Sequence, residues 1–160
     1  TLGFSWGVVG FIFSIMLLPF ILFQYPVGRL VDRFSNEREF IATGLLIISI
    51  ATIIFSLVGE ASIIAFTVIL FCTRLGASIV DVSNESYFFK HVTDEDTTTI
   101  AVFRNMTPLA YLVGPVLGII LLSWGTYPVV FFILGLVMFA GSIFALKLHD
   151  IKKVTNREIE

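Results

Sequence analysis

The sequence predicts an all-α fold, a polytopic membrane helix bundle with five transmembrane helices. Of its 160 residues, 57% are hydrophobic and only 14% are charged, whereas soluble domains average about 25% charged residues. The apolar residues also gather in five long runs, and a helix needs about 20 of them to cross the hydrocarbon core. Too few polar side chains remain to coat a water-soluble globule, so we expect a lipid bilayer around the chain.

The five expected spans are separated by short connections. Their apolar stretches are continuous, which favours helices over the alternating strands of a membrane β-barrel. A turn is expected between the last two spans, where Gly125 and Pro128 accompany the interface aromatics Trp124 and Tyr127. The expected spans cover about residues 2–28, 40–59, 61–89, 100–123 and 127–146, and a cytoplasmic tail follows at residues 147–160.

The first two spans are uncharged, but the third contains charged residues. Arg74, Asp81 and Glu85 share one helix face, because steps of seven and four residues rotate a side chain by only about 20–40°. A rise of about 1.5 Å per residue places Arg74 inside the hydrocarbon, Asp81 near its inner edge and Glu85 level with the headgroups. A charge in mid-membrane costs at least about 2.5–3.5 kcal/mol, so Arg74 is expected to face a bundle interior or a wet cavity.

Two interpretations of this face remain open. In one, Arg74, Ser78 and Asp81 line a substrate cavity, where Arg74 binds an anionic group and Asp81 carries a coupling proton. In the other, Arg74 belongs to a structural ion pair, Asp81 is a solvated or paired acid, and Ser78 makes an ordinary interhelical contact. Glu85 is expected to be a salt-bridge partner on the cytoplasmic side.

The fourth span contains Gly114, Pro115 and Gly118. Proline removes a backbone donor and can bend a helix, and glycines four residues apart allow close helix packing. The pattern predicts either a specialised helix-packing motif or a generic kink.

The placement of lysine and arginine predicts orientation. Nine of the ten basic residues fall on one side of the expected spans, and the tenth, Arg74, lies inside a span. Because lysine and arginine favour cytoplasmic loops, we expect the N-terminus outside and the C-terminus in the cytoplasm. The expected location is the plasma membrane.

Several classes of function are disfavoured by composition. A net charge of -2 argues against nucleic-acid binding, which needs a clustered cationic surface. A single cysteine, Cys72, excludes a multi-cysteine metal site, and we expect neither a metal nor a cofactor. An intramembrane enzyme is the least favoured reading, because His91 and His149 both lie at cytoplasmic ends and no catalytic motif occurs.

The connection after the first span resembles the cytoplasmic motif of the major facilitator superfamily. That motif has a glycine, a leucine and an Asp-Arg pair, followed by another glycine and basic residues. Ser35 and Asn36 stand at the last two of these positions, so the second half of the motif is degenerate. The matching residues are Gly28, Leu30, Asp32 and Arg33. Gly114, Pro115 and Gly118 are similar to a helix motif of the same family.

This resemblance implies a transporter of twelve helices in two six-helix halves. The degenerate loop, the orientation and the short tail favour helices 8 to 12, a fragment lacking the N-terminal half, while helices 2 to 6 remain open. The resemblance also implies a cytoplasmic gate of Gly28, Asp32, Arg33 and Glu85, in which Arg33 pairs with Glu85.

The function predicted from the sequence is therefore secondary active transport. We expect a fragment of a transporter that moves a small-molecule substrate by alternating access, driven by a coupling proton, another ion or the substrate gradient. A non-transporting membrane scaffold or channel subunit is the alternative.

Overall fold

The computed structural model describes residues 5–34, 36–58, 63–93 and 96–148, except the side chain of Asp32. These residues form five helices and no strand, and all five helices are long and apolar enough to cross a membrane. The all-α membrane bundle expected from composition is thus confirmed. The helices are α1 (Trp6–Phe34), α2 (Glu37–Leu57), α3 (Ile63–His91), α4 (Thr97–Trp124) and α5 (Tyr127–Ala145).

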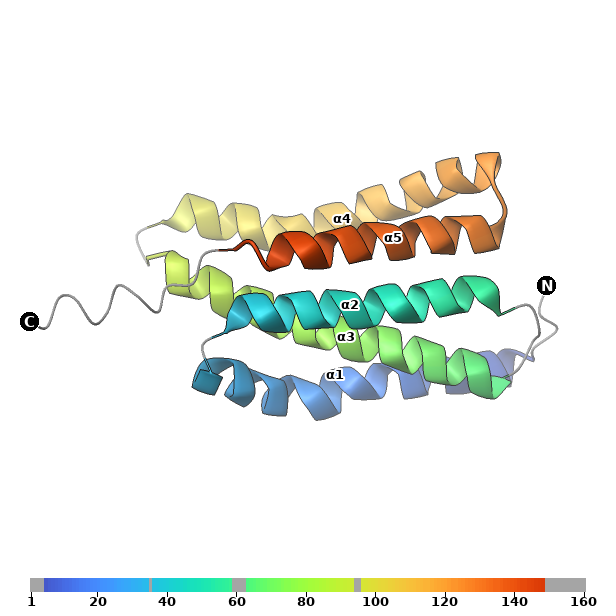
Figure 1. Cartoon of the computed structure of the whole chain (residues 1–160), viewed down its shortest axis with the longest axis horizontal. Helices are drawn as coiled ribbons and strands as arrows, with labels where there is room; N and C mark the ends of the chain where they lie inside the picture. The colour runs from blue at the N-terminus through green and yellow to red at the C-terminus, as the bar shows by residue number, and fades with distance from the viewer. Residues whose placement is uncertain (1–4, 35, 59–62, 94–95, 149–160) are drawn as a thin grey trace, which may run out of the picture.

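The helices lie side by side along the long axis of the molecule and alternate in direction (Figure 1). Helices α1, α3 and α5 therefore run one way, and α2 and α4 run back. The first described helix begins at one end of the bundle and the last finishes at the other. Most of the expected tail, residues 149–160, lies outside the described part of the chain.

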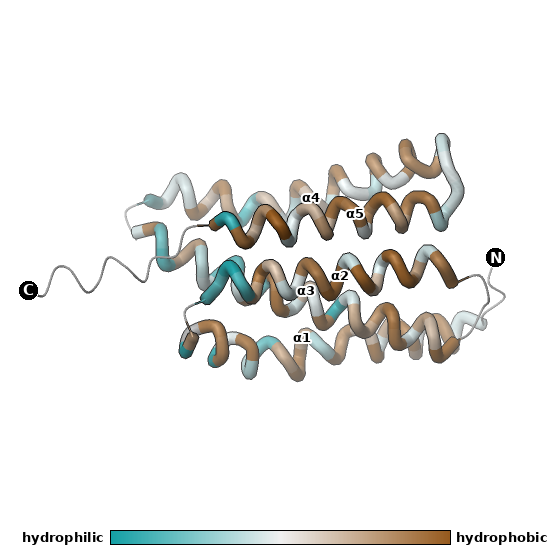
Figure 2. Tube along the Cα trace, viewed as in Figure 1, coloured by the Kyte–Doolittle hydropathy of each residue, from teal (hydrophilic) through white to brown (hydrophobic). Residues whose placement is uncertain are grey.

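Hydrophilic residues gather at one end of the bundle (Figure 2). We call this the charged end: α1, α3 and α5 finish there, and α2 and α4 begin there. At the opposite, uncharged end, the described residues include no charged side chain, but Trp6 and Trp124 are almost fully exposed. Tryptophan is enriched where a helix leaves the hydrocarbon. Basic residues of the charged end are Arg29, Arg33, Arg38, Lys90 and Lys147.

The turn between α4 and α5 has a simple local cause. Helix α4 ends at Trp124, and Gly125 continues in an extended conformation with φ -147° and ψ 179°. Pro128 then falls in the first turn of α5, where its missing N–H removes no helical hydrogen bond.

Helix α2 is the centre of the packing and makes its most extensive contacts with α5 and α3. A methyl group added at Gly76 of α3 would lie 2.7 Å from the carbonyl oxygen of Gly44 of α2. One added at Gly135 of α5 would lie 2.5 Å from Cγ1 of Ile53. The hydroxyl of Ser49 donates a 2.8 Å hydrogen bond to the Gly135 carbonyl. Small residues thus bring α2 close to two helix backbones at once, as is usual in membranes.

Helices α1 and α4 occupy the periphery. Helix α1 packs on α3, where a methyl group at Gly28 would lie 3.6 Å from Cγ1 of Val82. Helix α4 has no buried residue and touches α5 at few positions. It is attached to α3 at the charged end, where the rings of Phe88 and Phe103 stack with centroids 3.8 Å apart and planes 8° apart.

Candidate functional site

The polar residues of α3 form one stripe along the helix. At 3.6 residues per turn, they spread over only about 60° of the helix circumference. Gly76 and Val80, which contact α2, lie about 150° away from the centre of this stripe. It therefore points away from the packed interface with α2. The polar stripe consists of Arg74, Ser78, Asp81 and Glu85.

Two other helices flank the polar stripe. Val82, which contacts Gly28 of α1, lies about 70° to one side of its centre, and Phe88, which stacks on Phe103 of α4, lies about 50° to the other side. The stripe thus faces the space between α1 and α4.

The polar stripe passes through the middle of α3. With 29 residues, α3 is about 43 Å long, and Ser78 lies within about 2 Å of its centre along the axis. Arg74 is about 5 Å from the centre on the uncharged side, and Asp81 is about 6 Å from it on the charged side. In a hydrocarbon layer of about 30 Å centred on α3, Arg74 and Ser78 lie in the middle.

The hydroxyl of Ser78 is fully buried, with 0% exposure of the residue, and has no hydrogen-bond partner in the described part of the chain. Ser83 is equally buried, but its hydroxyl donates to the carbonyl oxygen of Ile79 at 2.7 Å. A buried polar group without a partner costs about 1–3 kcal/mol. Ser78 is one turn from Val82, so it lies beside the contact with α1, and its hydroxyl can still accept or donate a hydrogen bond there.

Arg74 is half-buried and makes no ion pair or hydrogen bond with any residue that the structure describes. Asp81, the nearest acid along the stripe, is exposed and lies about 10 Å farther along the axis. The structure therefore places Arg74, Ser78 and Asp81 on one face but does not pair their charges.

The predicted gate residues lie at the charged end. Gly28 contacts α3, whereas Arg33 and Glu85 are both exposed, and within the described residues no ion pair joins them. The backbone of Asp32 is helical, but its side chain lies outside the described part. The pairing of Arg33 with Glu85 stays a prediction.

The chain was compared with known protein families and known proteins. The model of the Major Facilitator Superfamily matches residues 1–160. The chain belongs to this superfamily. It is therefore an integral, multi-pass membrane protein of a transporter family, and that family is made up of transporters rather than enzymes. No curated protein and no solved structure matches the chain.

In this superfamily member, the glycine motif of α4 faces open space. A methyl group added at Gly114 or Gly118 would have nothing within 4 Å among the described residues, and Pro115 is exposed. The packing role of this motif stays a prediction.

An apolar groove of about 500 Å³ opens near the uncharged end, between α2, α3 and α5. Phe55 of α2 lines the groove and makes edge-on ring contacts. The centroid of its ring lies 5.1 Å from that of Phe66 of α3 and 4.6 Å from that of Phe131 of α5. Tyr127 and Pro128 complete the wall at the outer edge. No described residue fills the groove. The groove is therefore a surface on which another apolar element can pack.

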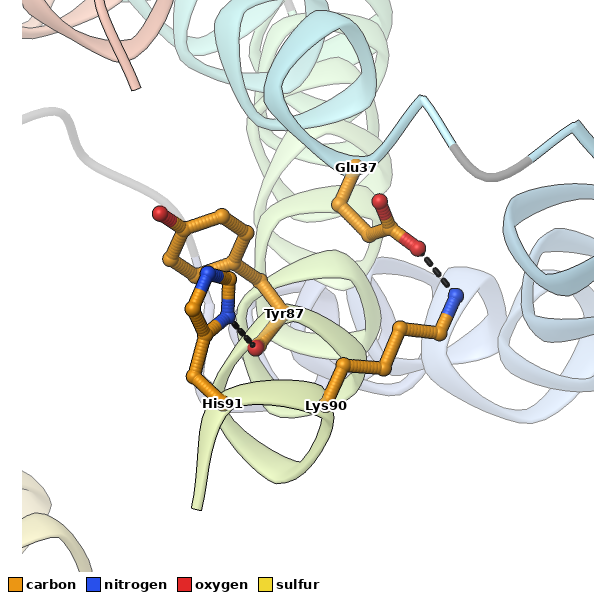
Figure 3. A network of polar contacts seen from close by, with 4 residues as sticks. All are labelled: Glu37, Tyr87, Lys90 and His91. Carbon is orange, nitrogen blue, oxygen red and sulfur yellow. Dashed lines mark hydrogen bonds and ion pairs between the residues drawn. The ribbon is translucent and has the colours of Figure 1, made fainter. Parts of the chain in front are cut away.

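An ion pair at the charged end was not predicted from the sequence. Glu37, the first residue of α2, is only 6% exposed, and Lys90 near the end of α3 donates to its Oε1 (Figure 3). Beside it, Nδ1 of His91 lies 2.7 Å from the Tyr87 carbonyl oxygen. Opposite charges at the same end of two consecutive spans were the available signal. The pair fastens α2 to α3 on the side expected to hold the gate.

Gln24 of α1 was also missed. Helices α1 and α3 run in the same direction and meet at Gly28 and Val82, so Gln24, one turn before Gly28, lies level with Ser78. Its side chain is exposed. A lone carboxamide inside an apolar span was the signal, since polar residues at such depth are rare and often functional.

Within residues 5–34, 36–58, 63–93 and 96–148, no group of three or more His, Cys, Asp or Glu side chains could hold a metal ion.

Proposed function

We propose that the protein is a secondary active transporter that moves a small solute across the membrane by alternating access. The observation that carries this proposal is the polar stripe of α3, whose unpaired Arg74 and unpartnered Ser78 lie at the centre of a membrane-spanning helix. Ionisable groups at that depth mark substrate or ion pathways by default, and transporter sites lie near the bilayer midplane. Membership of the superfamily supports the same function.

The orientation we propose places the charged end in the cytoplasm of the plasma membrane. Arginine and lysine residues gather there, and the described residues of the opposite end carry no charge. The positive-inside rule supports this assignment. The last described helix then finishes in the cytoplasm, and α1 begins outside.

Further helices of the transporter are proposed to cover α4 and the apolar groove. Helix α4 buries none of its residues, and its Gly114 and Gly118 surface is open to another helix. A superfamily half contains six helices, one more than the five described here. We assign α1 to α5 to helices 8 to 12, with a second half facing the polar stripe. Helices 2 to 6 have the same topology and are the alternative assignment.

The cytoplasmic gate is proposed to contain Gly28, Asp32, Arg33 and Glu85. Contact between Gly28 and α3 holds the end of α1 against the helix that carries Glu85. Arg33 and Glu85 are exposed and apart in this conformation, which suits a pair that forms in only one of two states. A Glu85→Gln variant is expected to shift the inward/outward equilibrium, measured by spin-label distances between the ends of α1 and α4. An unchanged distribution of these distances would show that Glu85 is not part of the gate.

Asp81 is proposed as the coupling group, because it follows Arg74 on the path toward the cytoplasmic end. A proton-coupled carrier loses accumulation but keeps exchange when its proton-carrying acid is neutralised. We therefore expect Asp81→Asn to abolish uptake driven by a pH gradient and to retain counterflow. Equal loss of both activities would assign Asp81 to substrate binding instead.

Transport itself is tested with the full-length protein in proteoliposomes. A panel of radiolabelled sugars, amino acids and organic acids is supplied, with and without a pH gradient. We expect uptake of a solute that is recovered chemically unchanged, and its loss in Arg74→Ala but not in Arg104→Ala, which removes an exposed cation of α4 outside the polar stripe. If Arg74→Ala takes up the solute at the wild-type rate, Arg74 is not part of the site. Ion currents without saturable uptake would instead favour a channel subunit, and absence of both would favour a scaffold.

A further inference from the structure

We infer that the transported solute carries an oxyanion, a carboxylate or a phosphate, and that Arg74 and Ser78 bind this group at the centre of α3. The inference rests on the proposed transport function and adds the chemical class of the substrate.

The charge of Arg74 is the first argument. A guanidinium stays protonated in proteins and has five N–H donors but no acceptor. No carboxylate of the described chain pairs with it. A central unpaired cation costs at least about 2.5–3.5 kcal/mol, and a bound anion offsets that cost directly. Carboxylates and phosphates also match the planar fork of arginine, which binds two of their oxygens at once.

Ser78 supplies an independent second observation. Its hydroxyl is fully buried without a partner, and it lies one helical turn from Arg74 on the same stripe. Neighbours four residues apart on a helix reach a common point. When α1 moves away from this face, an oxyanion held by Arg74 offers Ser78 the acceptor that this hydroxyl lacks.

The carboxamide of Gln24 completes the donor set. Gln24 lies level with Ser78 on α1, the helix that packs beside Ser78. Its NH₂ group is a further donor that can reach an oxyanion between the two helices. Two helices would then hold one ligand, and movement of α1 against α3 would open or close the site.

The acids of the polar stripe lie on the charged-end side of Ser78, and Arg74 lies on the opposite side. Asp81 and Glu85 lie about 6 and 12 Å from the centre of α3 toward the charged end, and both are exposed. Arg74 is donor-only, and Ser78 and Gln24 can each add a donor beside it. This combination favours an acceptor-rich ligand.

The test measures competition and uptake with the full-length protein in proteoliposomes. Three pairs of probes are used, each an oxyanion and a neutral counterpart: benzoate and benzamide, succinate and succinamide, glycerol 3-phosphate and glycerol. We expect one or more oxyanions to be transported and their neutral counterparts to fail. The carboxylate and phosphate arms distinguish the two kinds of oxyanion.

The variants assign the binding to named residues. Arg74→Gln is expected to raise the half-saturating concentration of the transported oxyanion about 10- to 100-fold, as for loss of a charged hydrogen bond. Arg74→Lys is expected to raise it by less. Ser78→Ala removes one oxygen atom and is expected to fold normally. It should raise the half-saturating concentration about threefold or more. A transported neutral or cationic solute, or an oxyanion whose affinity is unchanged in Arg74→Gln and Ser78→Ala, overturns the inference and leaves the transport function standing. Failure to transport any solute of the wider panel overturns the proposed function itself.

Discussion

Helices α2 and α4 are both apolar enough to cross a membrane, yet they differ in almost every packing contact. Helix α2 lies between α3 and α5, and its Gly44 and Ser49 meet Gly76 and Gly135 of those helices. Helix α4 carries two glycines, Gly114 and Gly118, and two prolines, but buries none of its residues. In lipid, hydrophobicity alone does not drive helices together, so packing depends on small residues that have a partner. Within the described chain, α1, α2, α3 and α5 therefore form the stable part, and α4 is held mainly at one end.

The largest expected effect comes from filling the closest backbone approach. Gly76→Val places methyl groups where Gly44 and Ile48 already lie, 2.7–3.1 Å from the position of the first added carbon. We expect a loss of about 3 kcal/mol in the free energy of unfolding, the upper part of the range for overpacking. The measurement is an SDS titration of the chain in mixed micelles, followed by circular dichroism.

Gly114→Val on α4 is the matched control for this substitution. Because nothing lies within 4 Å of its added carbon among the described residues, we expect a change within about 0.5 kcal/mol, as for ordinary exposed sites. Equal destabilisation by the two variants would contradict the contrast between α2 and α4.

The next effect concerns the ion pair that fastens α2 to α3. Lys90→Gln leaves the buried carboxylate of Glu37 without its partner, and a lost hydrogen bond to a charged group amounts to about 1.5–3 kcal/mol. We expect about 2 kcal/mol of destabilisation, largely recovered in the double variant Glu37→Gln/Lys90→Gln. Arg104→Gln of α4, an exposed cation, serves as the control and should leave stability unchanged. Full additivity of the Glu37 and Lys90 substitutions would show that the two residues are not coupled.

A smaller effect is expected at the attachment of α4. Phe103→Ala removes the stacked contact with Phe88, and aromatic pairs contribute about 0.5–1.5 kcal/mol beyond their buried area. We expect faster amide hydrogen exchange at the start of α4, with α2 unchanged. Phe132→Ala, an exposed ring of α5, is the control. Equal acceleration in α2 would mean that α4 is not separately attached.

The smallest effect is expected for the hydrogen bond between α2 and α5. Ser49→Ala removes the donor to the Gly135 carbonyl, and such bonds within membranes average about 0.6 kcal/mol. Ser123→Ala of α4 loses only a bond to the carbonyl of Ile120 in its own helix and should change stability less. If Ser123→Ala is the more destabilising of the two, the interhelical bond has no special role.

The five helices were predictable because an uninterrupted apolar run of that length has few alternatives in a chain with so little charge. The common face of Arg74, Asp81 and Glu85 was also predictable, since it follows from helical periodicity alone. The ion pair of Glu37 and Lys90 was not, because residues 53 positions apart meet only through the register of α2 on α3.

The roles of the glycines were equally hidden in the sequence. Gly76 and Gly135 make the closest approaches, whereas the more conspicuous Gly114 and Gly118 make none within the described residues. Which glycine meets a backbone depends on where two helices cross, and spacing along one helix does not contain that information.

The proposed transport site requires that the polar stripe faces a water-filled path rather than lipid. The direct measurement is cysteine labelling of the full-length protein in vesicles, on a Cys72→Ser background that removes the single cysteine of the chain. Cysteines are introduced at Arg74 and Asp81 of α3 and at Val137, an exposed apolar position in the middle of α5. We predict that a charged, membrane-impermeant methanethiosulfonate modifies the two α3 positions and spares Val137→Cys. If Arg74→Cys and Asp81→Cys are as unreactive as Val137→Cys, the stripe faces lipid and the transport site proposed here is wrong.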